Sequence, residues 1–320
     1  ALVVVIGLVV AAVVVVAFTP LLDARLDSDP DPAVDHAAAM ERAAALTAAD
    51  GPDVNPECTS RILDHGERTA RSVVLLHGYT NCPAQFSVVA DAYFNAGYNV
   101  VVARIPQHGM SDRLTTDLSY LTPGALVTLA DESVDIAAGL GERVSVVGLS
   151  AGGTLAAWLA AERSDVAEVA LMAPLIVPKV LPEVTVGAVA RLSRVIPDIY
   201  LWWDGDLKES LASPPYAYPR YSVHSLGALL AVGRDAQRDP GREVPLERMV
   251  VVTNENDAAV SNAAVGGLVD RLGEGAQQRV EHVFTEDLGY KHDIIDPQGE
   301  NVEDLDAIYD VLGPILGIPG

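Results

Sequence analysis

Ser150 stands in a short pattern that could make its side chain a nucleophile. It is the centre of the pentapeptide Gly-Leu-Ser-Ala-Gly at 148–152, a GxSxG motif between an apolar β-type run and a helical pattern. On such a strand-to-helix turn the hydroxyl is pushed out of the sheet, and the helix N-terminus lies under developing negative charge. The pentapeptide alone is weak evidence, but the strand and helix around it supply the required context. We therefore predict a catalytic serine rather than a plain turn residue.

A serine hydroxyl becomes a good nucleophile only when a positioned base removes its proton. After this type of turn, the acid and then the histidine are expected downstream of the serine. His292 follows the last predicted strand, in a loop before the final helix, and is the predicted base. His282 lies inside that strand, where it is expected to pack or face water. The other histidines lie in the N-terminal segment, ahead of the serine or in an insertion: His36, His65, His77, His108 and His224.

Asp257 is the predicted acid because it comes just after a strand that should end at the same sheet edge as the serine. There it would hold the imidazole in the correct tautomer and stabilise the imidazolium cation. Glu255 is the substitute candidate on the same loop. Asp287 and Asp293 lie too close in sequence to His292 to orient it easily from a separate strand. A helix-capping role for Asp257 is the competing interpretation.

Two backbone donors are needed for the oxyanion that forms on the attacked carbonyl. The first predicted donor is the N–H of Ala151, directly after the nucleophile. The second is the amide of Tyr79, in the turn His-Gly-Tyr-Thr at 77–80. His77 itself is expected to support this turn by hydrogen bonding rather than to act as the base. The loop at 104–112 is expected to buttress the same edge.

From residue 60 the strand and helix patterns alternate, which predicts an α/β fold with a mostly parallel, doubly wound sheet covered on both faces. The first two strands are expected to form a hairpin. The predicted elements are strands at 61–66, 72–77, 99–104, 143–149, 168–173, 249–253 and 279–284, and helices at 84–95, 123–140, 154–163, 262–272 and 302–316.

About 70 residues separate the strand that ends near Pro174 from the next one, too many for a simple connection. We predict a helical cap insertion at 178–245. It holds much of the aromatic content of the chain, including Trp202 and Trp203. These rings could line an apolar acyl pocket above Ser150, or simply hold the small subdomain together.

Taken together, the motifs resemble the α/β-hydrolase superfamily, most of all bacterial carboxylesterases and monoacylglycerol-lipase-like enzymes. The resemblance spans about 60–316 and implies an α/β-hydrolase core at 59–177 and 246–320. Asn254 stands where the family often has glycine. The matching residues are His77-Gly78-Tyr79-Thr80, the loop Pro106-x-His108-Gly109, and, as implied nucleophile, acid, base and oxyanion donors, Ser150, Asp257, His292, Tyr79 and Ala151.

Residues 1–22 begin with an uncharged run of mostly Val, Ala, Leu, Ile and Gly and have nearly the length of one membrane crossing. We expect a transmembrane anchor or an export signal, with a buried core segment as the alternative. Residues 23–58, rich in Asp, Pro and Ala, are predicted to be an acidic linker with a short helix around 36–49 that holds the enzyme off the bilayer.

Cys58 and Cys82 are the only cysteines of the chain. In an extracytoplasmic domain they could form a disulfide between the segment before the first strand and the loop after His77-Gly78. Two unrelated buried thiols are the alternative. Neither cysteine has the spacing of a zinc site. We expect no metal and no organic cofactor.

The formal charge of −23 argues against nucleic acid or anionic lipid headgroups as partners, because the field of the protein would repel them. The sequence thus predicts a membrane-anchored or secreted serine hydrolase that cleaves small-molecule or lipid carboxylic esters through an acyl-enzyme. The alternatives are another acyl hydrolase, such as a monoacylglycerol lipase, thioesterase or amidase, and a non-catalytic binding protein. Epoxide and haloalkane cleavage generally use an aspartate nucleophile, so Ser150 counts against them. The oligomeric state is not predicted.

Overall fold

The computed structural model of the protein describes residue 19 and residues 24–211, 214–238 and 246–318. The anchor or signal predicted at 1–22 lies outside these residues, apart from Thr19. Within the described ranges, no helix combines the length and apolarity that a bilayer crossing requires.

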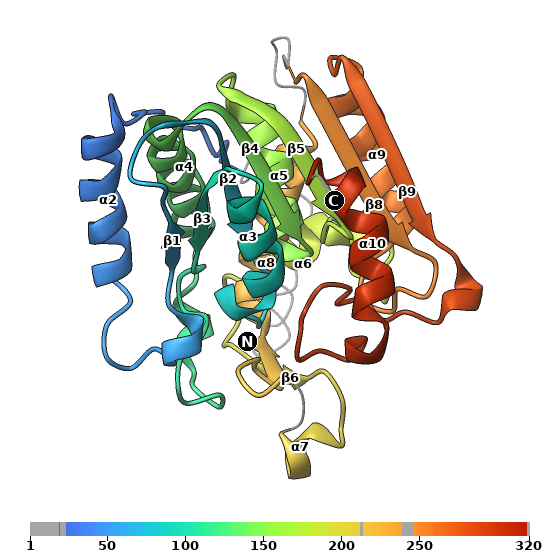
Figure 1. The fold of residues 1–320 in the computed structure, drawn as a ribbon. Helices are drawn as coiled ribbons and strands as arrows, with labels where there is room; N and C mark the ends of the chain where they lie inside the picture. Colours follow the sequence, from blue (N-terminus) through green and yellow to red (C-terminus); the bar gives the residue numbers. More distant parts are fainter. Residues whose placement is uncertain (1–18, 20–23, 212–213, 239–245, 319–320) are drawn as a thin grey trace, which may run out of the picture.

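In the described part of the chain, seven strands form one sheet in the order β1-β3-β2-β4-β5-β8-β9 (Figure 1). Every neighbouring pair is parallel except β1 with β3, which confirms the predicted mostly parallel sheet. The strands are β1 (Arg61–Leu63), β2 (Thr69–Leu76), β3 (Asn99–Ala103), β4 (Gly141–Leu149), β5 (Val166–Met172), β8 (Arg248–Asn254) and β9 (Gln278–Phe284).

The hairpin predicted between the first two strands is wrong. β1 pairs antiparallel with β3, with Arg61 opposite Val102, while β2 has parallel neighbours on both sides. Both edges of β2 are therefore occupied, and β1 can only add to the outer edge of β3. The side chain of Asn99 supports this arrangement by accepting from the backbone N–H of His65 at 2.8 Å and donating to Glu67 O at 2.8 Å.

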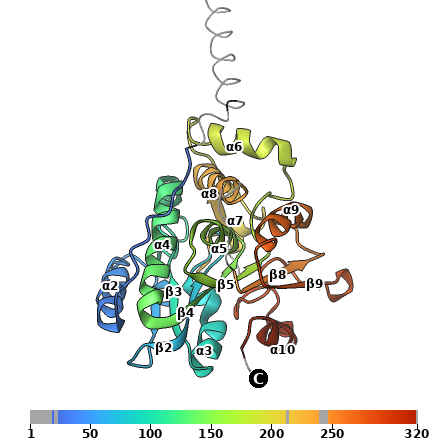
Figure 2. The ribbon, with the colours of Figure 1, turned by 90° about the horizontal axis from the view of Figure 1, so that it is seen from above.

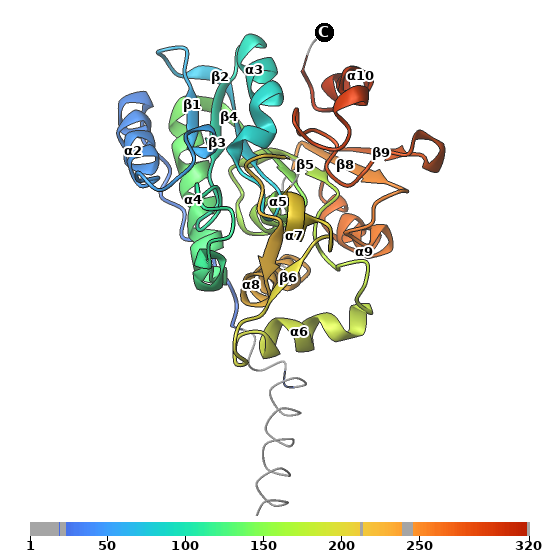
Figure 3. The same cartoon turned by 90° about the horizontal axis from the view of Figure 1, so that it is seen from below.

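Helices cover both faces of the sheet, as predicted (Figures 2 and 3). On one face lie α3 and α10, and on the other lie α4, α5 and α9 (Figure 2). Thr122 caps α4 by accepting from Ala125 N at 3.1 Å, and Pro123 fills its first turn. The bounds are α3 (Ser87–Asn95), α4 (Pro123–Leu140), α5 (Ala151–Glu162), α9 (Asn262–Gly273) and α10 (Leu305–Ile315), with 3₁₀ turns η3 (Pro83–Phe86), η4 (Asp117–Tyr120), η6 (Glu286–Leu288) and η7 (Val302–Asp304).

In its described part, the insertion predicted at 178–245 contains helices and a small sheet. Its last helix, α8, packs on α4 and α5 as an outer layer of the main body (Figure 2). Of the preceding elements, α6 packs on α8, and β6 and β7 form a two-stranded antiparallel sheet, which the sequence did not predict. The bounds are η5 (Glu183–Thr185), α6 (Val186–Leu192), β6 (Tyr200–Trp202), α7 (Leu207–Ser210), β7 (Arg220–Ser222) and α8 (Val223–Ala236).

The segment predicted as a spacer at 23–58 contains the expected helix, α2 (His36–Ala48), and a 3₁₀ turn, η2 (Pro56–Cys58). It does not stand away from the domain, because α2 packs beside α4 and the chain before it is hydrogen-bonded to the body. Leu26 N donates to Asp235 at 3.2 Å, and Leu26 O accepts from Trp158 Nε1 at 3.0 Å. The described part of this segment is therefore docked on the domain.

Cys58 and Cys82 form a disulfide, with their Cα atoms 5.2 Å apart. Both residues are fully buried. The bond joins η2 to the loop that follows the Gly78 turn, so it fixes the end of the N-terminal segment beside the sheet edge at which β2 ends.

Candidate active site

Ser150 lies in a strained turn between β4 and α5, with φ 55° and ψ −111°. A non-glycine residue in this region is uncommon and is found where the surroundings hold it in place. Its N–H donates to Met172 O at 2.8 Å. A Cβ on Gly152 would overlap the carbonyl oxygen of Leu76, and one on Gly148 would overlap the backbone of Gly152. Both glycines are thus required by close backbone approach.

His292 and Asp257 are brought together by the structure. His292 Nδ1 donates to Asp257 Oδ2 at 2.6 Å, and the aspartate is completely buried. Its other oxygen accepts from the amides of Ala259 and Val260 at 2.8 and 2.9 Å. Burial opposes ionisation, but these hydrogen bonds outweigh it and hold the pKa of Asp257 below its usual value. An ionised Asp257 keeps the imidazole proton on Nδ1, so Nε2 can accept a hydrogen bond from another partner.

The alternative interpretations of the acid are not supported by the geometry. Glu255 accepts from the backbone N–H of Glu286 at 2.8 Å. Asp293 accepts from side chains of a different loop. Helix α9 begins at Asn262 with Ser261 as its N-cap, so Asp257 is not its capping residue.

Two asparagines that sequence reasoning did not assign to the site hold the loop of His292 in place. Asn254, at the end of β8, donates to the carbonyl oxygens of Tyr290 and Lys291 at 2.7 and 3.1 Å. Asn301 accepts from Lys291 N at 2.8 Å and donates to Asp293 O at 2.6 Å. The side chain of Asn254 thus ties the loop of His292 to the strand that precedes Asp257.

The predicted oxyanion turn lies next to Ser150, since a Cβ built on Gly78 would come within 3.6 Å of Ser150 Cβ. Within the described residues, the backbone amides of Tyr79 and Ala151 donate to no protein acceptor. Ala151 is the first residue of α5, where helix amides are left without intrahelical partners. Two unengaged amides beside a serine hydroxyl are what an oxyanion hole requires.

The side chain of Tyr79 ties the oxyanion turn to α8. Its hydroxyl donates to Ser222 O at 2.8 Å and lies 2.5 Å from Ser225 Oγ. Burial raises the pKa of Tyr79 well above its usual value, so the phenol stays protonated. The hydroxyl of Thr80 accepts from Trp203 Nε1 at 2.9 Å. The turn that presents the Tyr79 amide is therefore held from the insertion as well as from the sheet.

His77 supports the turn, as predicted. Its Nδ1 donates to Gly78 O at 2.8 Å, and its Nε2 accepts from Ile105 N at 3.0 Å. Burial, together with the neighbouring imidazole of His108, holds the pKa of His77 well below its usual value. Burial likewise lowers the pKa of His108 to about 4. The expected buttressing by the loop at 104–112 is thus present, and both rings are neutral at physiological pH.

The two tryptophans proposed to line an acyl pocket lie on and just after β6. Trp203 is about half exposed and packs edge-on against Tyr79, with ring centroids 5.9 Å apart. Trp202 lies opposite Arg220 in the β6–β7 pair. Trp203 thus contacts the oxyanion turn directly.

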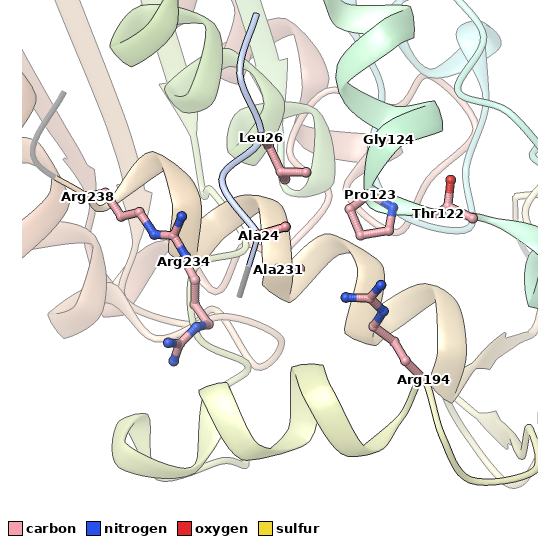
Figure 4. Close-up of a pocket in the computed structure, with 9 residues that line it drawn as sticks. All are labelled: Ala24, Leu26, Thr122, Pro123, Gly124, Arg194, Ala231, Arg234 and Arg238. Carbon is pink, nitrogen blue, oxygen red and sulfur yellow. The ribbon is translucent and has the colours of Figure 1, made fainter. Parts of the chain in front are cut away.

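A recess on the outer layer of the molecule is lined by a different set of residues (Figure 4). It measures about 200 Å³ and brings Ala24 and Leu26 together with the start of α4 and with arginines on and near α8. None of Ser150, Asp257 and His292 lines it. The residues that line it are Ala24, Leu26, Thr122, Pro123, Gly124, Arg194, Ala231, Arg234 and Arg238.

At the sheet edge, three parallel strands, β4, β8 and β9, end in the loops that carry the serine, the aspartate and the histidine. Because the strands run in the same direction, all three loops leave the sheet at its carboxyl edge. The arrangement contains a hydroxyl on a strained elbow, a carboxylate-bound imidazole and two unengaged amides. Those are the groups needed for acyl transfer to a serine.

Comparison with known proteins places the chain in a family. A family model described as the alpha/beta hydrolase family matches residues 73–304. A thermostable monoacylglycerol lipase from Bacillus sp. (strain H-257) is 31% identical over 102 residues, which make up 32% of this chain and 40% of the relative. The alignment therefore spans less than half the length of that relative.

Solved structures share the fold at low sequence identity. The monoacylglycerol lipase of Paleococcus ferrophilus superposes with a TM-score of 0.61 at 17% identity, over 81% of this chain and 98% of the other. A soluble variant of the monoglyceride lipase of Saccharomyces cerevisiae superposes with a TM-score of 0.56 at 15% identity, over 80% and 90%. At such identities the likeness establishes the fold alone. Because the family model covers more than half of the sequence, the chain belongs to the alpha/beta hydrolase family.

Proposed function

We propose that this protein is a serine hydrolase that cleaves carboxylic esters through an acyl-enzyme. The observation that carries the proposal is the 2.6 Å hydrogen bond between His292 and the buried Asp257, on loops at the sheet edge where the Ser150 elbow lies. A neutral imidazole oriented by an ionised carboxylate is the base that a serine hydroxyl needs.

In the proposed mechanism, Ser150 Oγ attacks the carbonyl carbon while His292 Nε2 takes the hydroxyl proton. The histidine then gives this proton to the leaving alcohol as the ester C–O bond breaks, and the acyl group stays on Ser150. A water attacks the acyl-enzyme with His292 again as base, which releases the carboxylic acid and restores the serine. The amides of Tyr79 and Ala151 stabilise the oxyanion in both halves, and Asp257 stabilises the imidazolium.

The proposed substrate is an ester of a small molecule or a lipid. The similar proteins named as monoacylglycerol lipases support an ester substrate. The contact of Trp203 with Tyr79 supports a place for that ring near the acyl group. For Trp202 the support is its position in the same β6–β7 sheet.

Purified protein assayed on p-nitrophenyl esters from acetate to palmitate tests the substrate class. We expect turnover with a clear optimum of chain length, and much slower turnover of the matching p-nitroanilides, because a poorer leaving group raises the acylation barrier. Faster turnover of an acyl thioester or of an anilide would assign the protein to thioesterases or amidases. Absence of all turnover, and of labelling by a fluorophosphonate, would leave a binding protein on a hydrolase fold.

We further propose that the catalytic domain is tethered to a membrane on its extracytoplasmic side, or is secreted. The apolar residues 1–18 support a membrane anchor or an export signal. The disulfide supports an oxidising compartment. The full chain should sediment with membranes or reach the medium, whereas a chain that starts at Ala24 should stay in the cytosol of the host. Recovery of the full chain in the cytosol with both thiols free would rule the proposal out.

A further inference from the structure

One buried side chain, Gln85 of η3, connects the oxyanion turn to the loop of the base. Its Oε1 accepts from the backbone N–H of Gly78 at 2.7 Å. Its Nε2 donates to Asp293 Oδ2 at 2.6 Å, and Asp293 directly follows His292. The glutamine is 2% exposed, so water does not compete well for either bond. The mechanism above uses neither Gln85 nor Asp293.

The far end of this connection is anchored by a second polar bridge. Asn81 Nδ2 donates to Asp293 Oδ2 at 3.0 Å and to Asp296 Oδ2 at 2.9 Å. Asp296 is fully buried and accepts from the hydroxyl of Tyr216 at 2.5 Å. Two carboxyl groups that follow His292 in sequence are thus held by the side-chain amides of Asn81 and Gln85.

The bridge matters because the peptide groups of Gly78 set the direction of the oxyanion turn. With the Gly78 amide held by Gln85, and Gly78 O held by His77, the next amide, that of Tyr79, keeps a fixed direction beside Ser150. The rate of acyl transfer depends steeply on where oxyanion donors lie, since removal of one donor typically costs about 10²–10³-fold in kcat.

We propose that Gln85 is a positioning residue, which sets the oxyanion turn relative to the base loop through its bridge between Gly78 and Asp293. The proposal rests on the proposed function for its kinetic consequences. In structural terms, Gln85 orders the Gly78–Tyr79 turn. Substrate does not need to touch Gln85 for this role.

The carboxyl group of Asp293 gives the proposal a distinctive dependence of kcat on pH. Burial, reinforced by the charge of Asp296, raises the pKa of Asp293 to about 7. The ionisable groups that act on Asp293 or on its partner Asp296 are His292 on the same loop, Tyr216 from the insertion and Tyr309 from α10. All of them are unchanged in the variants below.

Replacement Gln85→Glu keeps an acceptor for Gly78 N–H but sets a carboxyl group against Asp293, in place of an amide donor. The two carboxyl groups can hold the bridge only by sharing a proton, which they lose as the pH rises. We expect the ratio of Gln85→Glu to wild-type kcat to fall about tenfold between pH 6 and pH 9. Taking the ratio removes the pH dependence that the variant and the wild type share.

Replacement Gln85→Ala removes both bonds at every pH. We expect kcat to fall by about 10–100-fold with KM changed less than about threefold, because an interaction used mainly in the transition state is lost. Affinity for an aldehyde or boronate transition-state analogue should fall in parallel. The matched control is Gln298→Ala, an exposed glutamine near the same loop, which should behave as wild type.

Amide hydrogen exchange of residues 77–80 is measured on the same variants, and it does not require activity. Faster exchange in Gln85→Ala than in Gln298→Ala supports the positioning role. Equal exchange, a flat pH ratio for Gln85→Glu, or a loss of kcat that only follows a loss of folded protein by circular dichroism would overturn it. Labelling of the wild type by a fluorophosphonate reports separately on the proposed function.

Discussion

Ser150→Ala is expected to lower ester turnover by on the order of 10⁴–10⁶-fold and to abolish covalent labelling by a fluorophosphonate. In the proposed mechanism the hydroxyl oxygen of Ser150 forms the bond to the acyl group, and alanine has no atom that can replace it. Any residual turnover comes from the oxyanion amides and from substrate binding. Initial rates on a p-nitrophenyl ester, with mass spectrometry of the labelled protein, measure both effects.

The matched control is Ser145→Ala, five residues earlier on β4, where the side chain is buried within the sheet. This control should keep both activity and labelling. Because the substitution Ser150→Ala leaves the backbone of the turn in place, that variant should resemble the wild type in circular dichroism and melting temperature. Labelling that persists at another serine of the Ser150→Ala protein would refute the assignment of the nucleophile.

His292→Gln is the second change with a very large expected effect. Without the imidazole, the serine proton has no acceptor and the leaving alcohol has no donor, so kcat should fall by on the order of 10⁴–10⁶-fold. The buried carboxylate of Asp257 would lose its hydrogen bond from Nδ1 and keep the two backbone amides. We therefore expect fluorophosphonate labelling to slow by a similar factor at pH 8.

His282→Gln distinguishes the proposed base, His292, from a structural histidine on β9, the strand that precedes its loop. His282 lies on β9 and packs edge-on against Phe284, with ring centroids 4.6 Å apart. It should be replaceable with little change in kcat. If instead His282→Gln were inactive and His292→Gln retained more than about a tenth of wild-type turnover, the base would have been assigned to the wrong loop.

The sheet and its helices follow from periodicity because each element buries a continuous apolar face. The run of apolar residues in β3 and the capped, proline-started α4 left little room for another interpretation. The order in which the strands pair was harder to predict from the sequence. The short β1 joins β3 rather than β2, a choice set by which edges remain open once the parallel strands have assembled and not by the local sequence.

The residues proposed for chemistry were found because a motif or a strand end marks them. The residues that hold them were missed. Asn254, Asn301 and Gln85 act through side-chain bonds to the backbone of other loops, and an asparagine or glutamine has no periodicity or motif that would reveal such a role. The docking of residues 24–35 was missed for the same reason, since Asp- and Pro-rich composition predicts exposure and says nothing of hydrogen-bonded partners.

The hydrogen bonds of Leu26 to Asp235 and Trp158 have a mechanical consequence. The body of the enzyme starts almost where the apolar run stops, and residues 19–23 can span at most ~18 Å even when fully extended. Whatever holds the first residues therefore also restricts the orientation of the whole domain, because the connection between them is short. An ester would have to approach Ser150 from a direction that this short connection leaves open.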